Sequence, residues 1–219
     1  MLIIRLEENK INPRDIPKVR GYIAGKFPEF LELHNHIDNN EFRYGYPMIQ
    51  YKSVEGVPTI IGFNEYAVKL IEAFYDIKEI DFGNSIMEVH EKAYKIKNCD
   101  FGIAENYYNY RFVSPWMALN QKNYQKYNSA NDKEKTEILK KILIGNLLSM
   151  SKYLGYRVEQ PVNVFVKLIP VTVNFKNNKM LAFKGEFMTN FLIPDYLGIG
   201  KSVSRGFGTV VRTNNGGFK

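Results

Sequence analysis

The chain has 219 residues, of which 45% are hydrophobic and 24% are charged, a composition that excludes disorder as its main state. Its 30 basic and 23 acidic residues give a net charge of +7, and its one cysteine excludes an internal disulfide. No segment approaches the roughly 20 apolar residues of a membrane span, and the acidic residues near the start are atypical of a signal peptide. We therefore expect a cytoplasmic protein with no membrane partner.

The first part of the chain predicts elements in the order β-α-β-β-α-β. The expected helices begin at Asn12-Pro13, where asparagine caps and proline occupies the first helical position, and at Asn64 as a second cap. The expected strands span residues 2–6, 45–53, 57–63 and 85–96. This order is that of the ferredoxin-like unit.

The second part of the chain repeats this order incompletely. A long helix is expected over 131–154, because Asn131 and Glu134 have the spacing of a capping box. The expected strands span residues 101–113, 162–169, 171–175, 180–191 and 207–212, and the second helix is missing or reduced to a turn near Pro194. We predict an α+β protein with tandem ferredoxin-like (RRM-like) domains, antiparallel sheets and the boundaries 1–98 and 99–219.

Basic charge is concentrated in the last quarter of the chain. Residues 160–219 contain eight bases and two acids, so they carry nearly the whole positive excess. Such a field favours a polyanionic partner, since neutralising phosphates releases counterions. The 15 tyrosines and 15 phenylalanines also suit unpaired RNA, although most of these rings are expected in the core.

The most unusual local sequence lies between residues 198 and 208, where two G-x-G pairs enclose a basic, hydroxyl-bearing centre. Glycine lets backbone N–H groups approach a phosphate closely, and the central side chains add charge and hydroxyl donors. The residues of this stretch predicted to bind RNA are Gly198, Gly200, Lys201, Ser202, Ser204, Arg205, Gly206 and Gly208.

Two common phosphate-binding motifs do not fit this stretch. A Walker A loop needs glycine where this chain has Asp195, and it needs a following helix where β-prone residues follow here. The dinucleotide fingerprint fails because Val203 stands at the position of its third glycine. A flexible loop before a terminal strand is the simpler alternative.

With its G-x-G-x5-G-x-G spacing, the stretch 198–208 resembles the signature of the CRISPR-associated repeat-RNA endoribonucleases, family six in the Cas naming. Those proteins are built from two ferredoxin-like domains with the glycine loop near the C-terminus, so the resemblance covers essentially the whole chain. It implies binding of CRISPR repeat RNA and of crRNA. The loop also marks related proteins that do not cut RNA, so a non-catalytic crRNA-binding subunit of a CRISPR ribonucleoprotein is the alternative function.

A histidine pair supplies the chemistry that the loop lacks. His34 and His36 are two residues apart, so in an extended backbone both imidazoles point to the same side. Histidine titrates near pH 6.5, so one ring can accept a proton while another donates one. RNA provides its own nucleophile in the 2′-hydroxyl. This pattern predicts metal-independent cleavage that leaves a 2′,3′-cyclic phosphate and a 5′-hydroxyl.

The paired histidines and the tyrosine-rich segment after them are similar to the subtype of that family found largely in methanogens and clostridia, as is the segment 112–120. In that subtype a histidine of the H-x-H element and a nearby tyrosine carry cleavage. The resemblance therefore implies a catalytic role for His36 first and His34 second. It leaves Tyr44 and Tyr46 as alternatives for the tyrosine, with Tyr44 preferred because Tyr46 precedes Pro47 and suits strand packing. Which histidine is the acid and which the base stays open.

Two nearby cations, Arg43 and Lys52, are candidates for phosphate binding, with solvated strand charges as the simpler reading. A metal-dependent phosphodiesterase is a third functional hypothesis, because the H-x-H-x-D pattern from His34 matches most of a metallo-β-lactamase element. Asn39 replaces the last histidine of that element, and only His90 remains elsewhere. We therefore expect no metal and no cofactor. The sequence leaves open a homodimer and attachment to a CRISPR effector complex.

Overall fold

The computed structural model describes residues 1–28, 36–38, 41–42, 45–176 and 178–214. Contacts divide the chain into two compact units. Unit 1 comprises Met1–Cys99 and Val203–Gly206, and unit 2 comprises Asp100–Ser202 and Phe207–Lys219. The chain therefore leaves unit 2 at Ser202, contributes four residues to unit 1 and returns at Phe207, a detail that the sequence-based division does not contain.

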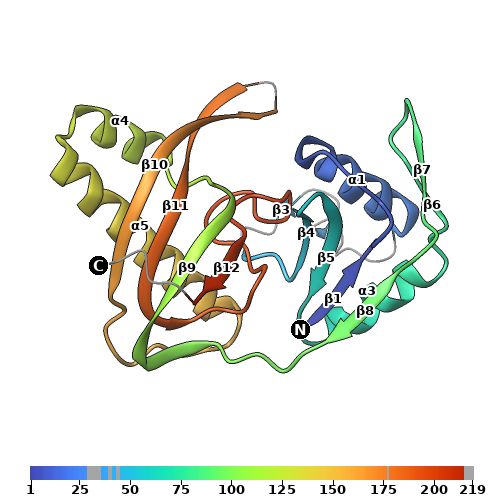
Figure 1. Ribbon diagram of the computed structural model, residues 1–219, viewed down its shortest axis with the longest axis horizontal. Helices are drawn as coiled ribbons and strands as arrows, with labels where there is room; N and C mark the ends of the chain where they lie inside the picture. Colours follow the sequence, from blue (N-terminus) through green and yellow to red (C-terminus); the bar gives the residue numbers. More distant parts are fainter. Residues whose placement is uncertain (29–35, 39–40, 43–44, 177, 215–219) are drawn as a thin grey trace. The chain divides into compact units, whose positions relative to one another are not determined.

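Unit 1 has the ferredoxin-like order of strands. Its sheet runs β4-β5-β1-β8, and each neighbouring pair is antiparallel (Figure 1). Two small hairpins, β2-β3 and β6-β7, lie outside this sheet. In chain order, the elements are β1 (Leu2–Arg5), the 3-10 turn η1 (Pro13–Asp15), α1 (Ile16–Lys26), β2 (His36–Asp38), β3 (Glu41–Phe42), β4 (Ile49–Val54), β5 (Val57–Gly62), α3 (Tyr66–Tyr75), β6 (Glu79–Asp81), β7 (Ile86–Glu88) and β8 (Ala93–Ile96).

The first helix begins as its sequence predicts. The side chain of Asn12 accepts a hydrogen bond from the backbone N–H of Arg14, and Pro13 opens the 3-10 turn that leads into α1. Residues Ile16, Val19 and Ile23 recur at helical spacing and are buried in the core of unit 1.

The second half of unit 1 differs from the sequence prediction. The residue before α3 is Glu65, which forms no side-chain cap, and Asn64 adopts a left-handed conformation instead. The expected strand over 85–96 is two short strands, β7 and β8. Between them, the ammonium of Lys92 donates to three carbonyl oxygens at and just after the end of α3, at 2.8–2.9 Å. Lys92 thus satisfies carbonyl groups at the end of the helix from the segment that separates β7 from β8.

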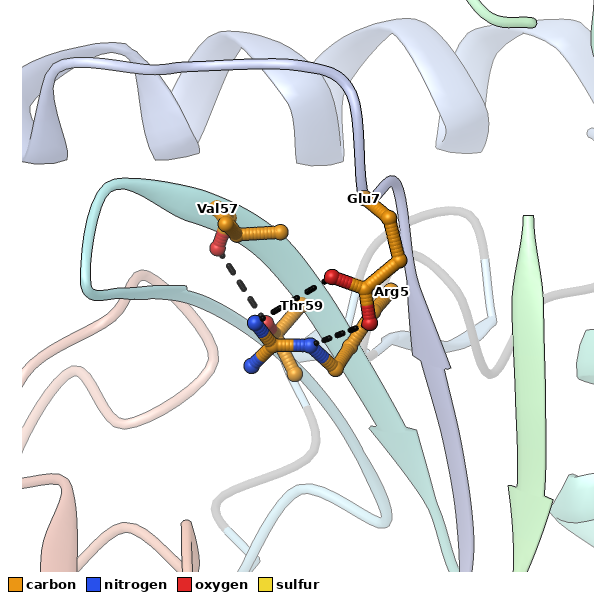
Figure 2. Close-up of polar contacts among 4 residues, drawn as sticks. All are labelled: Arg5, Glu7, Val57 and Thr59. Atoms are coloured by element: carbon orange, nitrogen blue, oxygen red, sulfur yellow. Dashed lines mark hydrogen bonds and ion pairs between the residues drawn. The ribbon is translucent and has the colours of Figure 1, made fainter. Parts of the chain in front are cut away.

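Figure 2 shows how a basic residue of the unit 1 sheet is neutralised locally. The guanidinium of Arg5 donates to both carboxylate oxygens of Glu7, at 2.9 and 3.5 Å. Its cross-strand partner Thr59 is buried and donates its hydroxyl to the carbonyl of Val57. Arg5 is therefore engaged in a two-contact ion pair and is not a candidate for binding an anionic ligand.

Unit 2 repeats the same sheet order with one helical connection in place of two. Its antiparallel sheet runs β10-β11-β9-β12 (Figure 1). The elements are β9 (Gly102–Trp116), α4 (Gln121–Ser129), α5 (Asp132–Tyr153), β10 (Val164–Phe175), β11 (Asn178–Leu192) and β12 (Val210–Thr213). The capping box at the start of α5 is present, with Asn131 and Glu134 bonding to each other's backbone N–H. Both units confirm the prediction of tandem antiparallel, ferredoxin-like α+β folds.

Three features of unit 2 correct or complete the sequence prediction. Helix α4 was not expected, although Asn120 caps it as a side-chain acceptor. The strands expected over 162–169 and 171–175 are one strand, β10. Pro170 is tolerated within it because β10 is an edge strand, where a missing N–H can face away from the sheet. The residues 193–209 contain turns and isolated bridges where the second helix of a complete unit would be.

The core of unit 2 is aromatic. The ring of Trp116 stacks on Phe112 and contacts Phe183, which in turn meets Tyr127 of α4. The indole N–H of Trp116 donates to the Oδ1 of Asn146 at 3.2 Å, so its polar edge is satisfied. Within the described part of the chain, the helices are too short or too polar to cross a membrane.

Candidate functional site

The base of the glycine-rich stretch is a small ladder within unit 2. Gly198 pairs with Thr209 as an antiparallel bridge, and the N–H of Ile199 donates to the carbonyl of Gly208 at 2.9 Å. The N–H of Gly208 donates in turn to the carbonyl of Pro115 in β9. The two G-x-G pairs are therefore the two sides of a closed loop, and they are fixed to the central strand β9.

Two of these glycines are required by close approach and by backbone conformation. Gly200 has φ +91°, and a Cβ atom there would lie 2.5 Å from the indole nitrogen of Trp116. Gly208 has φ +63°, and a Cβ atom there would overlap the carbonyl oxygen of Ile199. These glycines therefore build the loop by packing closely against their own unit.

Lys201, at the start of the loop, is exposed, but its side chain bonds to a backbone carbonyl of the protein. Its N–H donates to the carbonyl of Met117 at 3.1 Å, and its ammonium donates to the carbonyl of Leu119 at 2.9 Å. Partial burial lowers the pKa of the Lys201 ammonium. This lysine therefore ties the loop to the end of β9, while its remaining N–H protons stay available to a ligand.

The centre of the loop, residues 203–206, belongs to unit 1. Arg205 forms a parallel bridge with Tyr51 of β4, and Val203 is buried. Gly206 turns the chain with φ +92°, its N–H donating to the carbonyl of Val203 at 3.3 Å. The loop thus presents Ser204 and Arg205, both half-buried, beside the edge strand of the unit 1 sheet.

Lys52 does not occupy the position expected of a phosphate-binding lysine. Its side chain is completely buried, and its ammonium donates to the carbonyl of Val203 at 2.8 Å. Burial lowers the pKa of Lys52 well below its usual value. Such a group holds the loop against β4 and has no solvent-facing atom to offer a phosphate. Gln50, which the sequence also placed in this strand, is buried and donates to the carbonyl of Pro47.

The burial of Lys52 predicts a specific pH dependence of stability. The pKa of Lys52 is lower in the folded chain than the value of 10.5 expected in the unfolded chain. At any pH between these two values, the unfolded chain therefore binds more protons than the folded chain. The penalty for burying the charge is therefore relieved with rising pH. We expect the free energy of unfolding of the wild type, measured against Lys52→Met in denaturant titrations, to increase between neutral pH and about pH 10. A difference that stays constant or falls would contradict this assignment.

A residue that the sequence did not single out, Arg20 of α1, lies near this part of the loop. Burial lowers the pKa of the Arg20 guanidinium, and the like charge of Arg205 lowers it further. The hydroxyl of Tyr51 is buried and has no hydrogen-bond partner among the described residues. Burial raises the pKa of that hydroxyl, which therefore stays protonated and able to donate.

The two guanidinium groups are chemically suited to a phosphate, since planar guanidinium groups bind two phosphate oxygens at once. No motif marks Arg20 in the sequence. Its place beside Arg205 depends on α1 packing against β4, a contact between segments that are about 30 residues apart in the sequence.

The structure describes only some of the predicted catalytic residues. His36 begins β2, where it is paired with Phe42 of β3, so the backbone is extended at the second histidine as expected. His34, Arg43 and Tyr44 lie outside the described residues. Tyr46 is half-buried in an irregular segment just before β4.

The remaining histidine is remote from any such role. His90 is exposed and lies 3.3 Å from the carboxylate of Glu88. Among the described residues, no group of three or more histidine, cysteine, aspartate or glutamate side chains is placed to hold a metal ion. The H-x-H-x-D element lies partly beyond those residues, so this observation does not test it.

Known proteins resemble this chain over most of its length. Residues 1–100 match the family model of the Cas6b N-terminal domain, and residues 102–213 match that of the Cas6b C-terminal domain. A protein of Methanocaldococcus jannaschii described as uncharacterized is 46% identical over 142 residues, which cover 64% of this chain and 97% of that protein.

Solved structures agree with the family models. A crystal structure of Cas6b is 41% identical, with a TM-score of 0.92 over 97% of this chain and 98% of the other. A second structure, described as the CRISPR RNA processing endoribonuclease Cas6b, is 38% identical, with a TM-score of 0.76 over 97% of each chain. A Cas6-related protein of Pyrococcus furiosus shares the fold at 13% identity and a TM-score of 0.61. The two family models together with these two close structures show that this chain belongs to the Cas6b family.

Proposed function

We propose that this protein is a metal-independent endoribonuclease that cuts CRISPR precursor RNA within each repeat to produce crRNA in the cytoplasm. The observation that carries the proposal is the likeness over the whole chain to the Cas6b structure described as a CRISPR RNA processing endoribonuclease. The loop geometry supports it, because the glycines at 198, 200, 206 and 208 form a closed turn that carries basic side chains and is not a flexible linker.

The proposed chemistry is an attack by the 2′-hydroxyl of the RNA on the adjacent phosphorus. A bond forms between phosphorus and the 2′-oxygen while the bond to the 5′-oxygen breaks. A general base takes the proton of the 2′-hydroxyl and a general acid gives one to the leaving 5′-oxygen, so the protons balance. The products are a 2′,3′-cyclic phosphate and a 5′-hydroxyl, and the RNA supplies every reacting atom other than these protons.

We assign these proton transfers to His36 and His34, with His36 as the principal group. A tyrosine, Tyr44 or Tyr46, orients the 2′-hydroxyl or donates to the phosphate, since a phenol with a pKa near 10 is a poor base at neutral pH. We further propose that Arg43, Arg205 and Arg20 of unit 1 contact the phosphate of the RNA. In this proposal the catalytic residues lie within residues 1–98, and the glycine-rich loop lies within residues 99–219.

The loop is proposed to hold RNA through its backbone N–H groups and its polar side chains. Ser202, which has φ +57°, and Ser204 provide hydroxyl donors, and Arg205 provides charge. Lys52 takes a different role from the one expected of it. It is a positioning residue that acts through the carbonyl of Val203.

The proposal is tested with end-labelled repeat RNA in excess EDTA, beside the same RNA with a 2′-deoxy nucleotide at the scissile position. We expect cutting of the all-RNA strand at the rate seen without chelator, and no cutting of the deoxy strand, because the nucleophile has been removed. Loss of cutting in EDTA would instead indicate a metal-dependent phosphodiesterase. Tight binding of the all-RNA strand without any cutting would indicate a crRNA-binding subunit.

A further inference from the structure

A second basic surface lies in unit 2, in the groove between α4 and α5. The groove has a volume of about 480 Å³ and is lined by Lys126, Ser129, Ala130, Lys133, Glu134, Glu137, Ile138 and Lys141. Figure 1 shows the two helices that form it, one following the other along the chain. Three of its lining residues are the exposed lysines Lys126, Lys133 and Lys141.

The acidic residues of this groove are already engaged. Glu134 accepts the backbone N–H of Asn131 in the capping box, at 2.9 Å, and Glu137 accepts from Lys140 at 2.7 Å. The neighbouring Asp132 pairs with Lys135. The hydrogen bond from Lys140 is the main cause that lowers the pKa of Glu137, and the charges of Lys141 and Lys133 lower it further. The carboxylates therefore have their own cationic or N–H partners.

The three lysines that line the groove are not held in a close ion pair, although the charges of Lys133 and Lys141 act on Glu137 from a longer distance. Among the described residues, Lys126, Lys133 and Lys141 form no ion pair within 4.0 Å. Lys133 and Lys141 are eight residues apart on α5, which places them about 12 Å apart along one helix face at 1.5 Å per residue. Lys126 adds a third charge from α4.

A row of exposed, flexible ammonium groups is typical of surfaces that bind an extended polyanion. Each lysine is a point charge without the fixed fork geometry that selects one small ligand, so it contacts successive phosphates and releases their counterions. Precursor RNA is such a polyanion, and it continues beyond the cut repeat in both directions. The groove lies outside the glycine-rich loop and the histidine pair, both of which are already assigned.

We propose that the groove between α4 and α5 binds the sugar-phosphate backbone of single-stranded RNA that flanks the cleaved repeat. This inference rests on the proposed function for the identity of the RNA. It assigns to Lys126, Lys133 and Lys141 a sequence-independent contribution to affinity. It gives them no part in the cleavage step.

The test compares two RNAs, a single repeat and the same repeat extended by spacer sequence at both ends, each with a 2′-deoxy nucleotide at the scissile position. The test variant is Lys126→Gln/Lys133→Gln/Lys141→Gln. The matched control is Lys10→Gln/Lys78→Gln/Lys95→Gln, which removes three exposed lysines of unit 1 and lowers the net charge equally. Affinities are measured by fluorescence anisotropy across a range of salt concentrations.

We expect the wild type and the control to bind the extended RNA more tightly than the repeat alone. The test variant should bind the extended RNA about tenfold or more weakly than the control, and the slope of log affinity against log salt should fall by about 2, since each lost phosphate contact to a single strand contributes about 0.7. Its affinity for the repeat alone should equal that of the control.

Equal losses in the test variant and the control would overturn the inference, because they would show a general charge effect. A lack of any gain from the flanking sequence in the wild type would overturn it too. Neither result affects the proposed function, which is scored separately by cleavage of the all-RNA repeat. Photo-crosslinking of thiouridine placed in the flank, with the crosslinked peptide identified by mass spectrometry, should mark residues 121–141. Crosslinks confined to other segments would contradict the placement.

Discussion

Replacement of His36 with alanine is expected to slow single-turnover cleavage of repeat RNA by about 100-fold to 10,000-fold, the range that removal of a general acid or base produces. The affinity for the uncleaved RNA should change little, because the imidazole acts on protons in the transition state and contributes few ground-state contacts. The rate is measured with protein in excess over end-labelled RNA, and the affinity with the 2′-deoxy substrate.

Further variants test the roles of the other proposed catalytic residues. His34→Ala should also slow cleavage, but by less than His36→Ala, and the comparison of Tyr44→Phe with Tyr46→Phe identifies which hydroxyl assists. His90→Ala is the matched control, since that exposed histidine is paired with Glu88 and has no assigned role. If His36→Ala cuts at the wild-type rate, the proton-transfer role of His36 is wrong. If all of these variants bind RNA and the wild type itself does not cut, the crRNA-binding alternative is favoured.

The sequence correctly predicted two features of the fold that depend on local chemistry. The capping box of Asn131 and Glu134 and the Asn12-Pro13 start of α1 both formed as expected, because each is a hydrogen-bonding pattern between residues a few positions apart. The order of strands in both sheets followed from the alternation of elements.

Features that depend on tertiary packing were not predicted. Helical spacing predicts Ala67, Val68, Ile71 and Phe74 as the apolar face of α3, and this is wrong for Val68 and Ile71, which are exposed. The helix buries Leu70, Ala73 and Phe74, an alternative face of the same apolar character. Pro170 indicates a strand break in a sequence, but the edge position of β10 removes its cost.

In the candidate site, the positions of single side chains also depend on tertiary packing and were not predicted. The glycine spacing identified the loop, yet it did not indicate that Lys52 is buried beneath Val203 or that Arg20 approaches Arg205. Both facts arise because residues 203–206 belong to unit 1 while the rest of the loop belongs to unit 2. A lysine in a strand has the same sequence signature whether its ammonium faces solvent or a buried carbonyl.

The glycines of the loop differ in how much space each has for an added side chain. Gly208→Ala should destabilise the protein by about 3 kcal/mol or more, because a left-handed non-glycine residue costs about 1–3 kcal/mol and the new methyl group would also overlap the carbonyl oxygen of Ile199. The ladder between Ile199 and Gly208 would have to open to relieve that overlap. We therefore expect loss of RNA binding as well as a lower melting temperature.

Gly206→Ala is the matched control for this prediction. Gly206 has φ +92°, so alanine is strained there as well, but its Cβ atom would lie 3.4 Å from the nearest atom, a methyl carbon of Ile16. It should cost about 1–3 kcal/mol, from conformational strain alone. Gly21→Ala, on the exposed side of α1 with open space around it, should stabilise by up to about 1 kcal/mol. Thermal unfolding and anisotropy with 2′-deoxy repeat RNA measure all three. If Gly208→Ala and Gly206→Ala lose equal stability, strain alone explains both, and the close approach of Gly208 to Ile199 does not hold the loop closed.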